Sequence, residues 1–257
     1  AMVAYGDLDC SVIDELPPGR TPVTTTLIDH DRRDAVIKRV GAACRDGRQA
    51  YWVCTAIEES DSLHIEAATA TLDTLSAALP GVAIGLVHGK LKPADKASVM
   101  AQFKAGTLQL LVATTVIEVG VDVPRASLMI IDNAERLGLA QLHQLRGRVG
   151  RGAIESHCVL LFRPPLSNTA QERLKVMQDT HDGFVIAEAD LRIRGPGELL
   201  GTRQTGLAQF RVARLPEHEA LLITAHDIAQ QLHQHDLTRA QALMTRWAGP
   251  RADFARV

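Results

Sequence analysis

The sequence predicts a three-layer α/β domain with a mostly parallel sheet, followed by an α-helical appendage. Over about residues 21–164, short apolar runs alternate with segments of helical periodicity, and no strand pattern follows them. The runs are apolar on both faces, which is typical of strands buried inside a parallel sheet. The expected strands are residues 23–28, 50–54, 84–88, 109–113, 127–131 and 157–162.

The helices expected between these strands carry apolar stripes, as amphipathic helices do when they cover a sheet. The stripe of the first helix is Val36, Val40 and Ala43, and the stripe of the second is Ala68, Leu72, Leu75 and Leu79. A third helix is expected to begin near Pro93, which lies in its first turn, and to end just before Gly106.

The appendage is expected to contain helices and a glycine-rich loop, but no strand. Two stretches, about 167–180 and 183–192, predict a helical hairpin, and a glycine-rich loop then runs to Gly206. At the other end of the chain, prolines punctuate residues 1–22, which predicts an extended linker. The first of two final helices carries the stripe Leu221, Ala225, Ile228 and Leu232.

Composition excludes several classes of protein. Hydrophobic residues make up 46% of the chain, but no apolar run reaches the roughly 18 residues that a membrane helix needs. Aromatic residues are only 4%, which argues against a base-stacking platform. The histidines show no metal-ligand spacing, so no metal site is expected. The four cysteines, Cys10, Cys44, Cys54 and Cys158, are scattered, which favours a reduced cytoplasm.

The net charge of −2 does not indicate a nucleic-acid binder, but the distribution of charge is uneven. Residues 141–151 contain three arginines and no acid, and residues 191–214 contain five arginines and one acid. Local basic stretches of this kind can bind phosphates even in a chain that is nearly neutral overall.

The most informative segment is residues 144–152 (QLRGRVGRG), beside a predicted helix end. Arg148 and Arg151 lie three residues apart in it, and each follows a glycine. A guanidinium is permanently charged, and its planar set of N–H donors matches the geometry of phosphate oxygens. This pattern predicts a phosphate site, although by itself it is equally compatible with a basic surface turn.

A second informative segment is residues 111–124 (LVATTVIEVGVDVP). A buried strand ends there in two hydroxyls, Thr114 and Thr115, and a turn with Gly120 and Asp122 follows. Ligands bind at the carboxyl ends of strands in parallel α/β folds, so these side chains predict a binding site. The alternative is a polar helix cap, for which threonine is common.

Together with residues 87–89 (VHG), these segments resemble motifs IVa, V and VI of superfamily 2 helicases, in the same order and at similar spacing. A more specific resemblance is to the RecG family of DNA helicases, carried by residues 5–25, 136–152 and 190–206, and it covers essentially the whole chain. It implies a RecA-like second motor lobe at residues 23–164. Residues 1–22 would then be an interlobe linker or the tail of the first lobe. Residues 165–257 would hold the TRG motif, with its helical hairpin, loop and C-terminal helices.

The resemblance also implies roles for single residues. Arg148 and Arg151 would be arginine fingers that reach the γ-phosphate of ATP. The residues matching other nucleotide contacts are Gly120, Asp122 and Gln144, with Asp122 at the ribose and Gln144 beside the phosphates.

Two further sets follow from the same resemblance. The residues matching contacts to a DNA backbone phosphate are His88, Gly89, Thr114 and Thr115. The residues matching those that couple lobe movement to DNA are Arg173, Arg194 and Gln204. For the coupling set the alternative is structural, because arginine and glutamine often only pin a loop to a helix.

The sequence contains no G-x-x-x-x-G-K-[ST] loop to cradle phosphates and place magnesium. Residues 85–90 (GLVHGK) are one residue short of that pattern, and Leu91 stands where the hydroxyl is needed. No D-E-x-H or D-E-x-Q box is present either. ATP and Mg²⁺ are therefore expected to be bound mainly by a first lobe outside this sequence, and the chain alone is expected to be inactive as an ATP hydrolase.

The resulting hypothesis is a motor lobe for ATP-driven translocation on duplex DNA. Such a motor would remodel branched junctions and stalled replication forks in recombination and repair. Its expected partners are branched DNA and the first lobe and wedge domain of the same protein, and it is expected to be a monomer away from membranes. Alternatives are a nucleic-acid-binding module without ATP chemistry and the motor of a transcription-repair coupling factor. A small-molecule α/β enzyme is excluded, since no glycine fingerprint follows Ile28.

Overall fold

The computed structural model describes residues 22–55, 61–114, 123–152, 154–194 and 221–248, with the backbone alone at 61–64, 194, 222–223 and 247–248. The chain divides into two compact units. The first unit, Leu16–Gly195, contains the sheet, and the second contains the last two described helices. Each unit is described by itself below.

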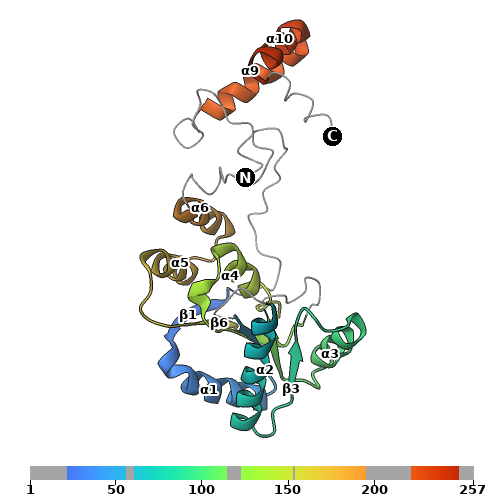
Figure 1. Ribbon diagram of the computed structural model, residues 1–257, viewed down its shortest axis with the longest axis vertical. Coiled ribbons are helices and arrows are strands. Elements are labelled where there is room, and N and C mark those ends of the chain that lie inside the picture. Colours follow the sequence, from blue (N-terminus) through green and yellow to red (C-terminus); the bar gives the residue numbers. More distant parts are fainter. Residues whose placement is uncertain (1–21, 56–60, 115–122, 153, 195–220, 249–257) are drawn as a thin grey trace. The chain divides into compact units, whose positions relative to one another are not determined.

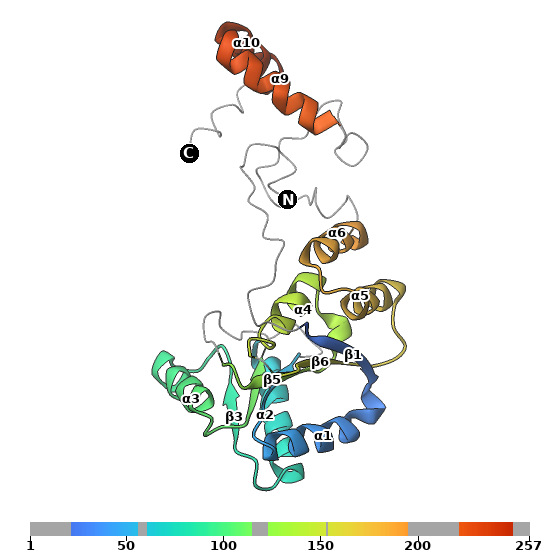
Figure 2. The ribbon, with the colours of Figure 1, turned by 180° about the vertical axis from the view of Figure 1, so that it is seen from behind.

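The first unit is built on one sheet of six parallel strands in the order β1-β6-β5-β2-β4-β3 (Figures 1 and 2). All six strands expected from the sequence are present, and their bounds shift by at most one residue. The strands are β1 (Thr24–Asp29), β2 (Gln49–Cys54), β3 (Ile84–Val87), β4 (Leu110–Thr114), β5 (Ala126–Ile131) and β6 (His157–Phe162).

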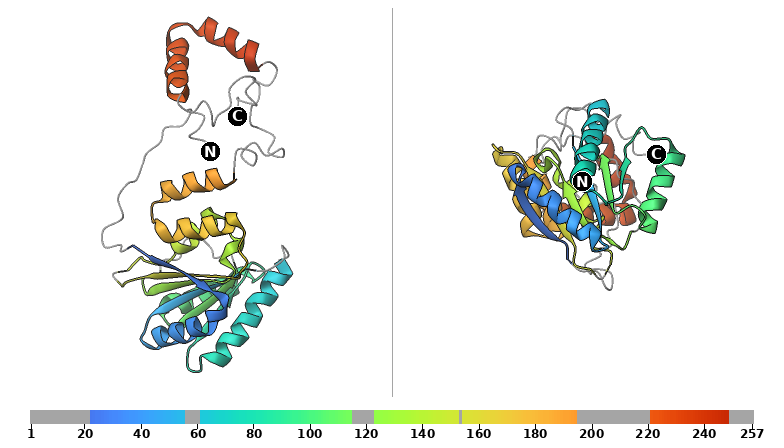
Figure 3. Two further views of the ribbon diagram at one scale, coloured as in Figure 1. Left: turned by 90° about the vertical axis from the view of Figure 1, so that its left-hand side faces the viewer. Right: turned by 90° about the horizontal axis from the view of Figure 1, so that it is seen from below.

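Helices cover both faces of this sheet, which makes the predicted three layers (Figure 3). Alternate residues of the central strand β2 point to opposite faces: Tyr51 and Val53 join one buried cluster, and Trp52 and Cys54 join the other. On the Trp52 face lie α1 (Arg33–Arg45) and α2 (Asp61–Ala78). On the Tyr51 face lie α3 (Pro93–Ala105), α4 (Leu139–Arg146), α5 (Asn168–Asp179) and α6 (Gly183–Arg194).

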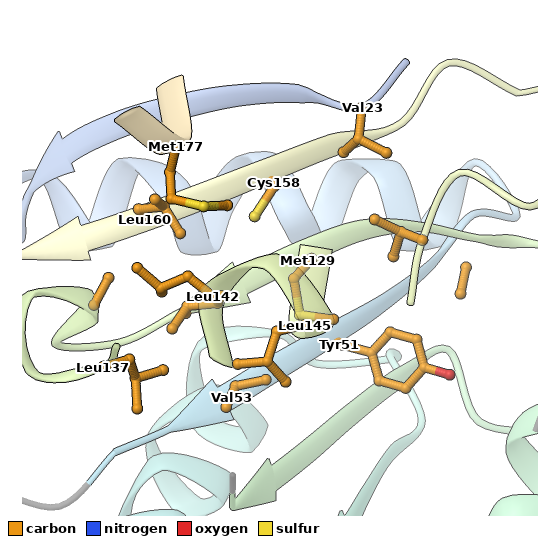
Figure 4. Close-up of a cluster of buried hydrophobic side chains, with 14 of the residues drawn as sticks. Val23, Tyr51, Val53, Met129, Leu137, Leu142, Leu145, Cys158, Leu160 and Met177 are labelled. Carbon is orange, nitrogen blue, oxygen red and sulfur yellow. The ribbon is translucent and has the colours of Figure 1, made fainter. Parts of the chain in front are cut away.

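The cluster on the Tyr51 face joins the sheet to the helices that carry the arginine motif. Leu142 and Leu145 of α4 and Met177 of α5 enter it beside the strand residues (Figure 4). At its other side the ring of Tyr51 packs on Phe103 of α3, with ring centroids 4.9 Å apart. Helices α4 and α5 therefore share one continuous core with the sheet.

The burial on both faces that was expected of every strand is incomplete for the two edge strands. β2 and β4 are buried at every position, but β1 and β3 are partly exposed. Edge strands have a neighbour on one side only, so helices cover them less completely.

The predicted limits of α3 are confirmed, because Pro93 opens the helix and Gly106 ends it in a left-handed conformation (φ 82°).

The predicted helical hairpin is present as α5 and α6, and it packs against α4. The first compact unit includes this hairpin. In the second unit, α9 (Leu222–His235) packs on α10 (Leu237–Ala248). The stripe expected on α9 is largely exposed, with Leu221 at 59% and Ile228 at 51%.

The three described cysteines are all buried and unpaired. Burial raises the pKa of Cys44 to about 11 and the pKa of Cys54 and Cys158 to about 12. The thiolate is the reactive form, so these thiols are expected to react with iodoacetamide at least about 100-fold more slowly in the native protein than in denaturant. Mass spectrometry of each cysteine peptide measures this. Rapid native alkylation of Cys158 would contradict the packing around β6.

Candidate functional site

The residues predicted to contact DNA meet at the carboxyl ends of β3 and β4. These strands are neighbours, and Val87 is paired with Ala113, so His88 and Thr114 follow at equivalent positions. Thr114 is buried, Gly89 is exposed, and His88 is half-buried with no described hydrogen-bond partner for its buried Nδ1. Thr115 lies outside the described residues. The fold thus places three of the four predicted residues at one edge.

The predicted arginine fingers lie on the loop that follows α4. The last turn of α4 continues into this loop, because Arg148 N donates to Leu145 O (3.0 Å) and Val149 N to Arg146 O (3.3 Å). Val149 is fully buried and anchors the loop, and Gly150 takes a left-handed conformation (φ 79°). We call residues 147–152 the arginine loop.

The side chains of this loop face outward to different extents. Arg148 is half-buried, and its side chain makes no hydrogen bond or ion pair with any other described residue. Arg151 and Gln144, the latter on α4, are exposed. The Arg148 guanidinium, held on an anchored loop with no carboxylate partner among the described residues, is available to an anionic ligand.

The arginine loop ends in a tight backbone contact. A Cβ atom on Gly152 would lie 2.6 Å from the carbonyl oxygen of Pro124, so only glycine fits at this position. Pro124 is the last residue of the predicted motif V segment and lies two residues before β5, at the amino end of the sheet. Gly120 and Asp122 of that segment lie outside the described residues. The arginine loop is therefore packed on the end of the predicted nucleotide segment, away from the edge that carries His88 and Thr114.

One predicted coupling residue connects the hairpin to the start of α4. Arg173 of α5 donates from Nη1 to Leu137 O (3.0 Å) and from Nη2 to Glu135 O (2.9 Å). These carbonyls lie in and after the short helix η3 (Ala134–Arg136), which leads into α4. Arg194 ends α6, and its side chain is not described. Gln204 lies outside the described residues.

The sequence reasoning missed Arg146, which is 3% exposed and hydrogen-bonded to α5. Burial lowers the pKa of its guanidinium, and the neighbouring Cys158 opposes that shift. In the sequence it is one of three arginines in a basic stretch, and nothing in that spacing separates it from Arg148. The apolar neighbours Leu142 and Leu145 on the same short helix are the one signal that could have indicated burial.

A second missed group lies at the carboxyl end of β5. Asp132 Oδ2 accepts from Trp52 Nε1 (2.7 Å) and pairs with Arg33 Nη2 (3.3 Å), and the Arg33 guanidinium lies over the Trp52 ring. The two interactions of Arg33 join the start of α1 to the sheet, and the bond from Trp52 to Asp132 joins β2 to the end of β5. We assign this group a structural role.

Within the described part of the chain, no cluster of histidine, cysteine and carboxylate side chains has the arrangement of a metal site. The described helices also include none long and apolar enough to cross a membrane.

Two family models match this chain. Residues 31–153 match the helicase conserved C-terminal domain, which defines the class of this α/β unit. Residues 180–245 match the C-terminal part of domain 3 of the ATP-dependent DNA helicase RecG. The chain belongs to the RecG family and corresponds to the C-terminal region of its members.

Individual relatives agree with this assignment. RecG from Escherichia coli K12 is 64% identical over 96% of the chain, and RecG from Acidithiobacillus ferridurans is 58% identical over all of it. The chain spans 36% and 38% of the lengths of these two relatives. A solved structure of RecG bound to a three-way DNA junction matches 85% of the chain and 28% of its own chain, with 46% identity and a TM-score of 0.66.

Proposed function

We propose that this chain is the second motor lobe of an ATP-dependent translocase on duplex DNA, which remodels branched junctions and stalled forks. The observation that carries the proposal is the arginine loop. It presents the Arg148 side chain without a partner among the described residues, and Gly152 fixes the end of the loop against Pro124. The relative solved on a three-way junction supports branched DNA as the substrate.

In this proposal the nucleotide lies between the arginine loop and a first lobe on the longer protein. Arg148 and Arg151 supply positive charge to the γ-phosphate as negative charge develops in the transition state. Gly120, Asp122 and Gln144 contact the rest of the nucleotide. Mg²⁺ and the attacking water are held mainly by the first lobe, because this chain contains no phosphate-binding loop of the required pattern.

DNA lies along the other edge of the sheet in this proposal. Thr114 and Thr115, with the turn at His88 and Gly89, hold a backbone phosphate. Contacts to phosphates position a protein on DNA without reading its sequence, as a translocase requires. Arg173, Arg194 and Gln204 then transmit movement of the lobe to the DNA through the hairpin and the loop beyond it.

The division of the chain follows the same scheme. Residues 1–22 connect to the first lobe, residues 23–164 form the motor lobe and residues 165–257 form the coupling region. The hairpin at the start of the coupling region packs on the motor lobe, which supports a mechanical connection between them.

The chain alone is expected to show no DNA-stimulated ATP turnover, because its arginine fingers have no bound phosphate to act on. A phosphate-release assay with three-way junction DNA measures this for the purified chain and for the longer protein that includes the first lobe. The longer protein should hydrolyse ATP and separate the junction strands. Turnover by the chain alone would contradict the two-lobe proposal, and DNA binding by the longer protein without any turnover would favour a non-catalytic module.

A further inference from the structure

Arg146 is a buried cation whose polar partners include no carboxylate. Its Nη1 donates to the carbonyl oxygens of Thr180 (2.8 Å) and Met177 (2.9 Å) and more weakly to Thr25 Oγ1 (3.4 Å). Its Nη2 lies 3.1 Å from His143 Nδ1, which must accept because arginine only donates. Among the described residues no carboxylate pairs with it.

The two carbonyls belong to the end of α5, where helix carbonyls lack partners within the helix and carry partial negative charge. These carbonyls compensate the burial of the Arg146 charge. Breaking the contact would leave a cation buried without compensation, which is strongly unfavourable. The end of α5 is therefore held to α4 by an interaction that is costly to lose.

The same junction is packed closely around His143. A Cβ atom on Gly183, the first residue of α6, would lie 3.3 Å from His143 Nε2. The turn between α5 and α6 is also attached to the sheet, because His181 Nε2 lies 2.7 Å from Val23 O. The hairpin turn thus has little room to shift relative to the end of α4.

Arg146 and Arg173 hold opposite ends of α4. Arg173 binds the carbonyls of Glu135 and Leu137 just before α4 begins, and Arg146 is the last residue of α4. The arginine loop continues directly from Arg146 through the hydrogen bond of Val149 N to Arg146 O. Any displacement of the loop that moves the end of α4 is consequently transmitted to the hairpin.

We propose that Arg146 is a positioning residue that makes the α5–α6 hairpin move together with the arginine loop. It contacts neither nucleotide nor DNA in this role, and it lies outside the coupling set Arg173, Arg194 and Gln204. The role rests on the proposed motor function. Without the bond from Arg146, the arginine loop still reaches the nucleotide, but its movement is no longer passed to the hairpin.

The test uses Arg146→Met and Arg146→Lys in the longer protein, with Arg48→Met as the matched control. Arg48 also bridges distant segments, donating to Ser127 Oγ (2.7 Å) and Glu155 O (2.6 Å), but it does not touch the hairpin. Three quantities are measured on one preparation: amide hydrogen exchange in α5 and α6, DNA-stimulated ATP turnover and junction unwinding.

For Arg146→Met we expect faster exchange confined to the hairpin, ATP turnover within about threefold of wild type, and at least about fivefold less unwinding per ATP hydrolysed. Arg146→Lys should recover part of the unwinding, because an ammonium group can still donate to the α5 carbonyls. Arg48→Met should leave the unwinding per ATP unchanged, whatever it does to stability.

Two outcomes overturn the proposal. One is unchanged exchange in the hairpin, and the other is a parallel fall of turnover and unwinding that keeps their ratio at the wild-type value. Failure of the motor function itself is distinguishable, because the wild-type longer protein would then show no ATP turnover. In that case hydrogen exchange in the hairpin would still test the bond from Arg146 to the α5 carbonyls. The coupling role of Arg146 would be rejected.

Discussion

Replacing Arg148 by alanine in the longer protein is expected to lower DNA-stimulated ATP turnover by about 10³–10⁵-fold, the range observed for arginine fingers. The half-buried guanidinium has no described partner and lies on a loop anchored by Val149. It is therefore preorganised for charge that develops on the γ-phosphate, and alanine removes that charge without disturbing a hydrogen bond in the described structure. Phosphate release under saturating ATP and DNA measures the effect.

The matched control is Arg45→Ala, which removes one exposed positive charge at the end of α1. It should leave turnover near the wild-type value, and junction binding should be nearly unchanged in both variants. Turnover of Arg148→Ala within about threefold of wild type would reject the finger assignment, given the magnitude of such contributions. A large loss of junction binding would instead place Arg148 on the DNA.

Replacing Gly152 by alanine is the second change for which a large effect is expected. The added methyl would lie 2.6 Å from the Pro124 carbonyl oxygen, and backbone on both sides of the contact cannot yield as a flexible side chain would. The loop must shift, and Arg151 shifts with it. A displacement of about 1 Å at a catalytic centre can reduce the rate about 100-fold, so turnover should fall by roughly that factor.

Gly147→Ala provides the comparison within the same loop. Its Cβ would meet only the carbonyl oxygens of Gln144 (3.4 Å) and His143 (3.5 Å), which are ordinary contacts, and its backbone is already helical. Turnover and melting temperature should therefore change much less than in Gly152→Ala. Equal losses in the two variants would mean that any added methyl disturbs the loop, and that the contact with Pro124 has no special role.

Much of the local structure could be predicted because it depends on local properties. A buried strand such as residues 110–114 is apolar at nearly every position, and a helix such as 93–105 is bounded by a proline and a left-handed glycine. The arginine pair at 148 and 151 and the hydroxyl pair at 114 and 115 are likewise visible as short patterns. These features survive in a single sequence because they require no knowledge of which segments meet.

The arrangement of these pieces was decided only by the tertiary structure. Strand order places β3 beside β4, which brings His88 to Thr114, and places the arginine loop against Pro124 at the opposite end of the sheet. Burial separated Arg146 from Arg148, although both belong to one basic stretch, because only Arg146 faces the end of α5. Such contacts join residues more than twenty-five positions apart, and their energy depends on packing and desolvation that no local pattern of residues encodes.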